Sequence, residues 1–152
     1  MNKNYEEFKK ECTKAMEVLG IYDRALEMRM IKTKKGTISG YYENKEKLLR
    51  DTFRYDGVNN IFFTLNVFSE DLLARGKDKL IEYASHTISD SEITRRELLL
   101  IDVDPKRPAG VSSTDEELQS SETVLIEVVN FLTSEGFPEP VIACSGNGYH
   151  AL

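Results

Sequence analysis

The hydrophobic pattern of the first 58 residues predicts two helices and a hairpin. From about Tyr5 to Leu19, apolar residues recur at intervals of three and four positions, which is typical of a helix, and Gly20 ends the pattern. Two short strand-like runs, "ALEMRMIK" and "GTISGYYEN", flank a Lys-Lys-Gly turn and predict a β-hairpin. The segment "NKEKLLRDTFRYD" then shows the polar-rimmed pattern of a second helix.

The middle of the chain combines an aromatic run with polar segments. Residues Asn59 to Phe68, "NNIFFTLNVF", are rich in aromatic and β-branched residues and predict one buried strand. Ser69 stands where it would cap a short helix over "SEDLLARGKDKL". The segment from Tyr83 to Glu92 is polar and has no period, so we expect a mobile loop there.

The last third of the chain predicts a strand, a long helix and a second strand. The apolar run from Glu97 to Val103 is the first strand. Thr114 and Glu117 have the spacing of a capping box, and Gly136 follows the last periodic residue of the helix. The apolar stripe of this helix consists of Leu118, Leu125, Val128, Val129 and Leu132.

Polar groups follow both strands of this predicted unit. Asp102 and Asp104 end the first strand, and the glycine-rich turn "SGNGYH" leaves the second strand, "PVIAC". Binding sites in α/β sheets commonly collect at strand ends. Because a crossover helix leaves its two strands close in space, we expect the acids and the turn to face one ligand.

The composition is that of an ordinary globular protein. The 152 residues are 40% hydrophobic and 30% charged, which suits one domain or a core with a smaller lobe. The start, "MNKNYEEFKK", has no signal-peptide core, and no apolar run is long enough for a membrane helix. We therefore expect a cytoplasmic protein with no membrane partner.

The net charge of −6 at first argues against a nucleic-acid partner, because phosphate backbones favour basic surfaces. Enzymes that handle nucleotides through bound cations nevertheless need acidic sites. The basic residues also cluster locally, in Lys32 to Lys35, in Arg95 and Arg96, and in Lys106 and Arg107. The local distribution of charge therefore says more about a nucleic-acid partner than the net charge of the chain does.

The pair Asp102 and Asp104 is the strongest candidate metal site. Residues two apart in a strand point to the same face, with backbones roughly 7 Å apart. Two ionised carboxylates held together need protonation, a basic partner or a divalent cation, and hard oxygen ligands suit Mg²⁺ or Mn²⁺. The alternative is ordinary turn chemistry, in which ion pairs with Lys106 and Arg107 neutralise both acids.

The turn after the second strand is the candidate anion site. Its flexible glycines would let backbone N–H groups converge on a phosphate, with a serine hydroxyl and a histidine ring as further donors. The alternative is a plain hairpin turn with a packed histidine. The residues concerned are Ser145, Gly146, Asn147, Gly148 and His150.

Other candidate residues favour structural roles. His86 lies in a polar segment and matches no triad or metal spacing, so we expect a surface histidine. Phe62, Phe63 and Phe68 are expected in the core rather than in a base-stacking platform, although one exposed aromatic ring could serve both roles.

The two motifs together resemble the archaeo-eukaryotic primase superfamily, in particular the primase-polymerase domains of bacterial plasmids, phages and other mobile elements. In that family, motif I is an apolar strand ending in Asp-x-Asp, and motif II is a Ser-Gly-x-Gly-x-His type of turn. "LLLIDVDPKRPAGVSSTDEE" and "PVIACSGNGYH" match them in order, one helix apart. "GTISGYYEN", "FFTLN" and "LLARGKDKL" look like the module that precedes motif I.

The resemblance implies an α+β fold, with an RRM-like catalytic core joined to a smaller N-terminal α/β module. The module would span residues 1–95, and residues 96–152 would form the first part of the core. Asp102 and Asp104 would be catalytic and would bind Mg²⁺ or Mn²⁺, while residues 145–148 and His150 would contact the nucleoside triphosphate. Lys106 and Arg107 would be available to phosphate or to a DNA template and primer.

The chain departs from the family at one point. The family has a third motif, a metal-binding aspartate on a later strand, and Leu152 stands two residues after motif II. We therefore expect an incomplete core, which a missing C-terminal segment or a partner chain would complete. Three hypotheses stay open: a primase-polymerase portion, a catalytically inactive module that binds nucleotides or single-stranded DNA, and an accessory protein unrelated to nucleotides.

Overall fold

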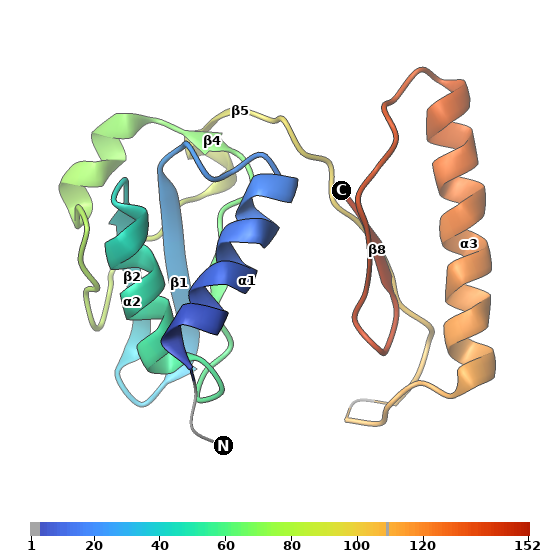
Figure 1. Cartoon of the computed structure of the whole chain (residues 1–152), viewed down its shortest axis with the longest axis horizontal. Helices are drawn as coiled ribbons and strands as arrows, with labels where there is room; N and C mark the ends of the chain where they lie inside the picture. The colour runs from blue at the N-terminus through green and yellow to red at the C-terminus, as the bar shows by residue number, and fades with distance from the viewer. Residues whose placement is uncertain (1–3, 109) are drawn as a thin grey trace. The chain divides into compact units, whose positions relative to one another are not determined.

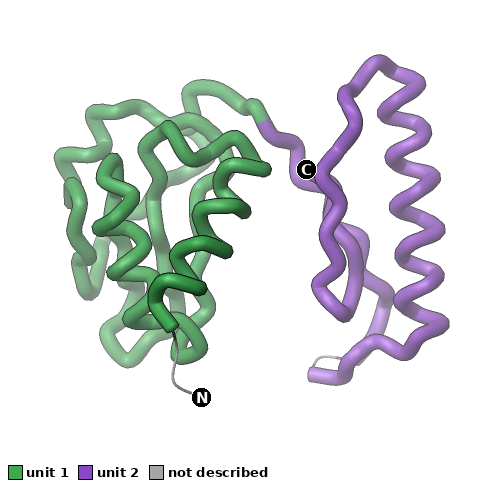
Figure 2. The backbone as a smooth tube through the Cα atoms, in the orientation of Figure 1, with its two compact units in different colours: residues 1–97 green, residues 98–152 purple. Residues whose placement is uncertain are grey.

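The computed structural model describes residues 4–108 and 110–152 and shows a mixed α and β chain, as the α+β class predicts (Figure 1). The chain divides into two compact units, residues 1–97 and residues 98–152 (Figure 2). We call them unit 1 and unit 2. Within the part of the chain that is described, no helix combines the length and the apolar character needed to cross a bilayer.

Unit 1 contains two α-helices, five strands and two short 3₁₀ helices among its described residues. They are α1 (Tyr5–Val18), β1 (Leu26–Thr33), β2 (Gly36–Tyr42), α2 (Lys45–Tyr55), β3 (Phe62–Phe63), β4 (Val67–Phe68), η1 (Glu70–Arg75), η2 (Asp90–Glu92) and β5 (Ile93–Arg95). Both predicted helices and the predicted hairpin of β1 and β2 are confirmed. Gly20 and Gly36 adopt positive φ angles of 64° and 67°, which explains the glycine after α1 and the glycine of the hairpin turn.

One face of the antiparallel sheet β2-β1-β3 carries the main core. Leu26, Met28 and Met30 alternate along β1 and are fully buried. The Thr52 hydroxyl of α2 lies 3.4 Å from the sulfur of Met28, so α2 covers this face. α1 packs beside α2, where the ring of Phe53 contacts two rings of α1 at centroid distances of 5.2 Å.

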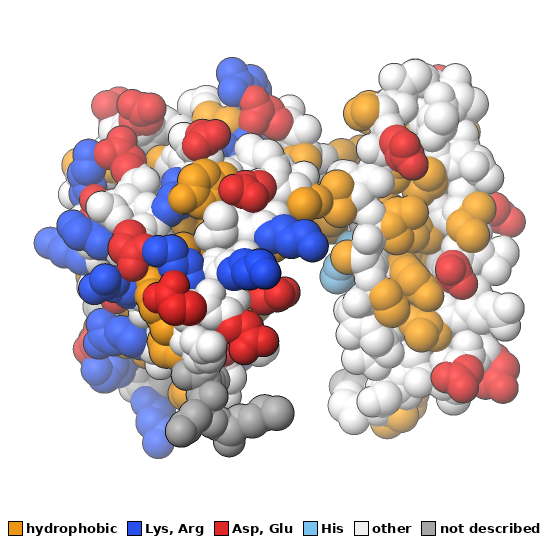
Figure 3. Space-filling model, viewed as in Figure 1, with side chains coloured by type: hydrophobic (Ala, Val, Ile, Leu, Met, Phe, Trp, Pro, Cys, Tyr) orange, Lys and Arg blue, Asp and Glu red, His pale blue; other side chains and the backbone are white. Residues whose placement is uncertain are grey.

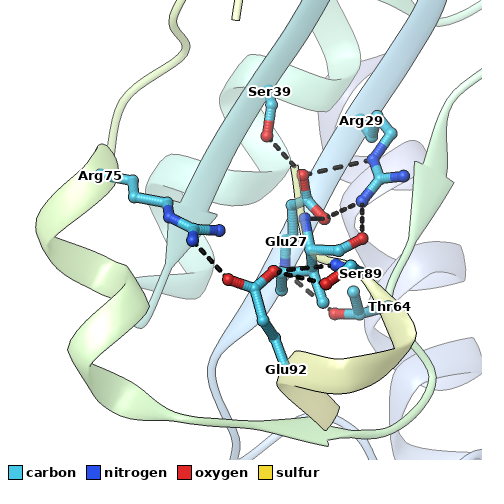
Figure 4. Close-up of polar contacts among 8 residues, drawn as sticks. Glu27, Arg29, Ser39, Thr64, Arg75, Ser89 and Glu92 are labelled. Atoms are coloured by element: carbon cyan, nitrogen blue, oxygen red, sulfur yellow. Dashed lines mark hydrogen bonds and ion pairs between the residues drawn. The ribbon is translucent and has the colours of Figure 1, made fainter. Parts of the chain in front are cut away.

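The other face of this sheet holds a buried carboxylate. The side chain of Glu27 is 1% exposed. Its oxygens accept hydrogen bonds from Arg29 at 2.5 Å, from the Ser39 hydroxyl at 2.6 Å and from the Ile88 N–H at 3.2 Å (Figure 4). A buried charge is tolerated only when it is paired and hydrogen-bonded, and this network therefore ties the segment around Ile88 to the sheet.

The segment from Tyr83 to Glu92 is anchored to the sheet at Ile88. It is irregular up to Ser89, as predicted, but Ile88 is buried and also accepts a hydrogen bond from Arg29. The segment ends in η2, where Ser89 and Glu92 form a capping box. Ser69 precedes η1 as predicted, but its side chain makes no capping hydrogen bond.

The prediction of one buried strand from Asn59 to Phe68 is wrong. The segment forms two separate strands. β3 pairs with β1, and the last hydrogen bond of this pairing runs from the Thr64 N–H to the Glu27 carbonyl oxygen. The chain then leaves this sheet, and β4 pairs with β5. Phe68 is buried, as expected. Phe62 and Phe63 lie on the edge strand β3 and are 47% and 37% exposed, so the expected core positions are wrong for these two residues.

Unit 2 is a three-stranded sheet with one helix. Its elements are β6 (Ile101–Val103), α3 (Asp115–Ser134), β7 (Ile142–Cys144) and β8 (Tyr149–Ala151). The strand order is β6-β8-β7, and β8 is antiparallel to both neighbours, so β6 and β7 run parallel to each other. The capping box of Thr114 and Glu117 and the long helix are confirmed, as is a strand before the glycine-rich turn. The turn joins the antiparallel pair β7 and β8, which corresponds to the alternative of a hairpin turn.

The predicted strand from Glu97 to Val103 is too long. Only residues 101–103 pair with another strand, and Leu99 and Leu100 are exposed. Among the described residues of unit 2, Leu125 and Ala151 are the buried hydrophobic side chains. Its three-residue strands therefore depend on few apolar contacts and largely on their hydrogen bonds. The exposed large hydrophobic residues of unit 2 are Leu99, Leu100, Val111, Val124, Ile126, Phe131, Phe137 and Ile142.

The contact between α1 and α2 predicts a dependence of stability on pH. Hydrogen bonds from Lys9, Arg50 and Tyr5 lower the pKa of Glu46 from 4.5 to about 2. Because the folded state favours the ionised form, its stabilising effect is complete above the unfolded pKa of 4.5 and is lost as the pH falls toward 2. The variant Glu46→Gln should therefore show a smaller loss of stability between pH 5 and pH 2, measured as the urea midpoint.

The control for this measurement is Glu7→Gln, which removes an exposed acid from the first turn of α1. It should keep the pH dependence of the unaltered chain. Equal pH dependence of Glu46→Gln and the unaltered chain would contradict the assigned role of Glu46.

Candidate functional site

The pairing of β6 with β8 brings the two sequence motifs together. Asp102 and His150 are direct partners across the two strands. Oδ1 of Asp102 lies 3.1 Å from Nε2 of His150, and the two side chains are 57% and 36% exposed. An acid from motif I and the histidine of motif II thus form one accessible pair on the sheet.

Asp104 lies against Gly148, which is two residues before His150. A Cβ atom at Gly148 would stand 2.1 Å from Oδ1 of Asp104 and 2.5 Å from the carbonyl oxygen of Val103. Only glycine allows the end of β6 to approach this closely. Both carboxylates of motif I therefore contact motif II: Asp102 contacts His150, and Asp104 contacts Gly148.

The turn of motif II is held by its own serine. Ser145 Oγ accepts hydrogen bonds from the N–H groups of Asn147 at 3.2 Å and Gly148 at 3.1 Å, and donates to the Gly148 carbonyl oxygen at 3.2 Å. Gly146 has a φ of 81°, a conformation that favours glycine. The N–H groups of Asn147 and Gly148 do converge, as expected. They converge on the Ser145 hydroxyl, which is a local acceptor only two and three residues earlier in the chain.

Ser113 positions this turn, and sequence reasoning did not identify it. Its N–H donates to Oδ1 of Asn147 at 3.1 Å, and its hydroxyl donates to the Asn147 carbonyl oxygen at 2.6 Å. Asn147 is thus tied to the residue that precedes the Thr114 cap of α3. The contact joins residues 34 positions apart, and no local spacing rule could reveal it.

The basic residues after β6 have different surroundings. The side chain of Arg107 is only 19% exposed, and its Nη1 atom lies 3.9 Å from Oδ2 of Asp104. This contact corresponds to the ion-pair alternative for that acid. Lys106 is exposed and lines, with Asp104, a cavity of about 450 Å³ beside the first half of α3.

The chemistry of these side chains fits Mg²⁺ or Mn²⁺ only in part. Carboxylate oxygens are the ligands that both ions prefer, and His150 adds a nitrogen beside Asp102. Over residues 4–108 and 110–152, however, no group of three or more His, Cys, Asp or Glu side chains is arranged to hold a metal ion. The described residues thus supply fewer carboxylates than a two-metal site requires.

The two units differ strongly in charge. Residues 1–97 hold 18 of the 20 Lys and Arg residues and 17 of the 26 Asp and Glu residues, which leaves two basic and nine acidic residues in 98–152. On the face shown in Figure 3, unit 1 presents basic and acidic side chains interspersed, whereas unit 2 presents acidic and apolar side chains. The acidic character of the chain therefore belongs to the unit that carries Asp102 and Asp104.

Comparison with family models, with curated proteins and with solved structures finds no match to this chain.

The close contact at Gly148 yields a prediction. The variant Gly148→Ala places a methyl group against the backbone of β6 and should destabilise the pairing of β6 with β8 by about 1–3 kcal/mol. Hydrogen exchange in the full chain should then accelerate at the amides of residues 101–103 and 149–151.

The matched control is Gly146→Asn. A Cβ atom at Gly146 meets nothing within 4 Å, and asparagine tolerates the positive φ of this position. Exchange at the same amides should change little in the control. If hydrogen exchange accelerated equally in both variants, the close approach of β6 would not be the reason why position 148 requires glycine.

Proposed function

We propose that this chain is part of a nucleotidyltransferase of the primase-polymerase type, with its site at the junction of β6 and β8. The observation that carries the proposal is the direct pairing of Asp102 with His150 across these strands. It unites an acidic motif suited to divalent cations with a motif suited to phosphate. The substrate class is nucleoside triphosphates, and the partner is a DNA template with its primer.

The topology of unit 2 supports the proposal. The order β6-β8-β7, with α3 connecting β6 to β7, is a split β-α-β arrangement. An RRM-like core has its first three strands in this order. The same order leaves the outer edge of β6 without a paired strand among the described residues, where a further segment or a partner chain could complete the sheet.

The residues of the site have distinct proposed roles. Asp102 and Asp104 bind the cations, and His150 holds one oxygen of Asp102 so that the other stays directed toward the ligand. Arg107 balances the charge of Asp104. The bound Mg²⁺ or Mn²⁺ would supply charge stabilisation on the attacking and leaving oxygens of the transfer.

The turn from Ser145 to Gly148 is the proposed contact of the triphosphate. The N–H groups of Asn147 and Gly148 already share one direction, because both donate to Ser145 Oγ. Rotation of the Ser145 side chain would present both N–H groups, and the hydroxyl itself, to a phosphate oxygen. In the proposed reaction, a primer 3′-hydroxyl loses its proton to solvent and attacks the α-phosphorus, where a new P–O bond forms. The bond from the α-phosphorus to the oxygen that bridges to the β-phosphorus breaks, and pyrophosphate leaves.

Unit 1 is the proposed contact of the nucleic acid. It holds nearly all the basic residues of the chain, whereas unit 2 is strongly acidic. Unit 1 also holds 17 acidic residues and is nearly neutral, so a template with its negative backbone meets far less repulsion there than at unit 2, unless cations occupy the site. The resemblance of the motifs implies a role in the replication of a mobile element.

The second candidate function is a catalytically inactive module that binds nucleotides or single-stranded DNA. It is favoured by the small number of carboxylates near Asp102, since the described residues form no group of three metal ligands. Such a module would use the same turn and the same acids for binding. It would not transfer a nucleotide.

A titration with Mn²⁺ tests the proposed metal site. Paramagnetic broadening should appear first at the amides of residues 101–104 and 148–151 of the full chain. The double variant Asp102→Asn with Asp104→Asn should bind at least about tenfold more weakly, because each lost carboxylate removes a charge-assisted contact. Glu127→Gln, an exposed acid of α3, is the control and should keep the affinity of the unaltered chain. Unchanged broadening in the double variant would remove the basis of the proposal.

Primer extension separates the candidate functions. With Mn²⁺, a nucleoside triphosphate and a primed template, the first function predicts an elongated product that is lost in the double variant. Binding of the nucleotide without any product supports the inactive module. If neither Mn²⁺ nor the nucleotide changes the melting temperature, both functions are excluded in favour of an accessory protein.

A further inference from the structure

Unit 1 contains a cavity with its own polar chemistry. Its volume is about 180 Å³. This is room for one phosphate group or for a few water molecules. The residues that line it are Ser39, Tyr41, Arg75, Ile81, Ala84, Ser85 and His86.

Two polar atoms of this lining are buried and have no partner. They are the hydroxyl oxygen of Tyr41, whose side chain is 1% exposed, and Nη1 of Arg75. The two side chains interact with each other, because Tyr41 raises the pKa of Arg75 through a hydrogen bond, but neither of these two atoms has a hydrogen bond of good geometry among the described residues. Native proteins rarely leave such groups unsatisfied, and an unpaired buried donor often marks the place of a water or an ion.

Arg75 is held in place from the opposite end of its guanidinium group. Its Nη2 atom donates to Glu92, and Glu92 in turn accepts from the N–H of Ser89 at 2.9 Å and from its hydroxyl at 3.0 Å (Figure 4). Glu92, and secondly Tyr41, raise the pKa of Arg75, so the side chain stays a cation. The anchored half fixes the group, and the Nη1 half remains for a ligand.

The available groups of the lining are donors. Arg75 and Tyr41 offer N–H and O–H groups, and the Ser85 hydroxyl and the His86 ring can add further donors. No residue of the lining is acidic. Ser85 and His86 are exposed, and they mark the side on which the cavity opens. Arg75 is the one cation of the lining and is paired with Glu92, and Ser39 already donates to Glu27. A small pocket with one guanidinium group and several further donors suits an oxyanion.

We propose that this cavity binds a single phosphate group through Arg75 Nη1 and the Tyr41 hydroxyl. The ligand is free phosphate or the terminal phosphate of a nucleic-acid strand, which share the same chemistry. The site belongs to unit 1 alone and does not depend on the proposed nucleotidyl transfer at Asp102 and His150.

Thermal melting of the full chain tests the site. Inorganic phosphate should raise the melting temperature above that in potassium chloride of equal ionic strength, because a ligand of the folded state stabilises it. The variant Tyr41→Phe should be at least as stable as the unaltered chain without phosphate, since it removes an unsatisfied hydroxyl. Its phosphate affinity should fall about tenfold, the effect of one good hydrogen bond to a charged ligand.

Two further variants make the test specific. Arg75→Lys keeps the charge and one contact to Glu92 but removes the Nη1 atom, and it should also lose affinity. Tyr83→Phe, an exposed tyrosine of the neighbouring segment, should keep the full phosphate response. The proposal is overturned if phosphate has no effect beyond that of chloride, or if Tyr41→Phe and Tyr83→Phe respond alike. A loss of stability in Tyr41→Phe without phosphate would show that the hydroxyl has a partner, and this also overturns it.

Competition distinguishes the two sources of the phosphate group. A short oligonucleotide with a 5′-phosphate is compared with the same oligonucleotide ending in a 5′-hydroxyl. Tighter binding of the phosphorylated form, displaced by inorganic phosphate and weakened in Arg75→Lys, assigns the site to a strand end. Binding of inorganic phosphate without any difference between the two oligonucleotides assigns it to free phosphate.

Discussion

The close approach of β6 to Gly148 is the constraint on which the candidate site depends. Each strand of this sheet is only three residues long, so its register has few hydrogen bonds to define it. The missing side chain of Gly148 lets the Val103 carbonyl oxygen and the Asp104 carboxylate lie directly against β8. A shift by one residue would turn Asp102 to the opposite face, away from His150, because side chains alternate along a strand.

Unit 1 depends on a different interaction, the burial of the Glu27 carboxylate. Burying a charge is costly, and the cost is offset only because Arg29, Ser39 and the Ile88 N–H all donate to it. Those donors come from the sheet and from an otherwise irregular segment. The network thus holds that segment on the sheet, and the residues just before Ile88 form one wall of the phosphate-sized cavity.

The distribution of charge distinguishes the two units. Unit 1 holds 18 basic and 17 acidic residues and is nearly neutral, whereas unit 2 holds two basic and nine acidic residues. The net charge of the whole chain conceals this difference. The charge argument against a nucleic-acid partner therefore applies to unit 2 rather than to unit 1.

Local patterns were sufficient for much of the fold. Helices, their caps and the hairpin of β1 and β2 follow from periodicity and from contacts within a few residues, which is why the capping box of Thr114 and the turn at Gly36 could be predicted. The long aromatic run failed as a prediction. Whether Phe62 and Phe63 are buried depends on which strands reach the edge of the sheet, and local composition does not encode that.

The candidate site shows the same division. The sequence by itself determined that two acids end one strand and that a glycine-rich turn leaves another, because residue order fixes both. Only the tertiary structure decided that Asp102 faces His150, that the turn donates to Ser145 Oγ, and that Arg75 and Tyr41 keep unpaired atoms beside one cavity. These features arise from pairing and packing between distant segments, whose free energy depends on the whole chain.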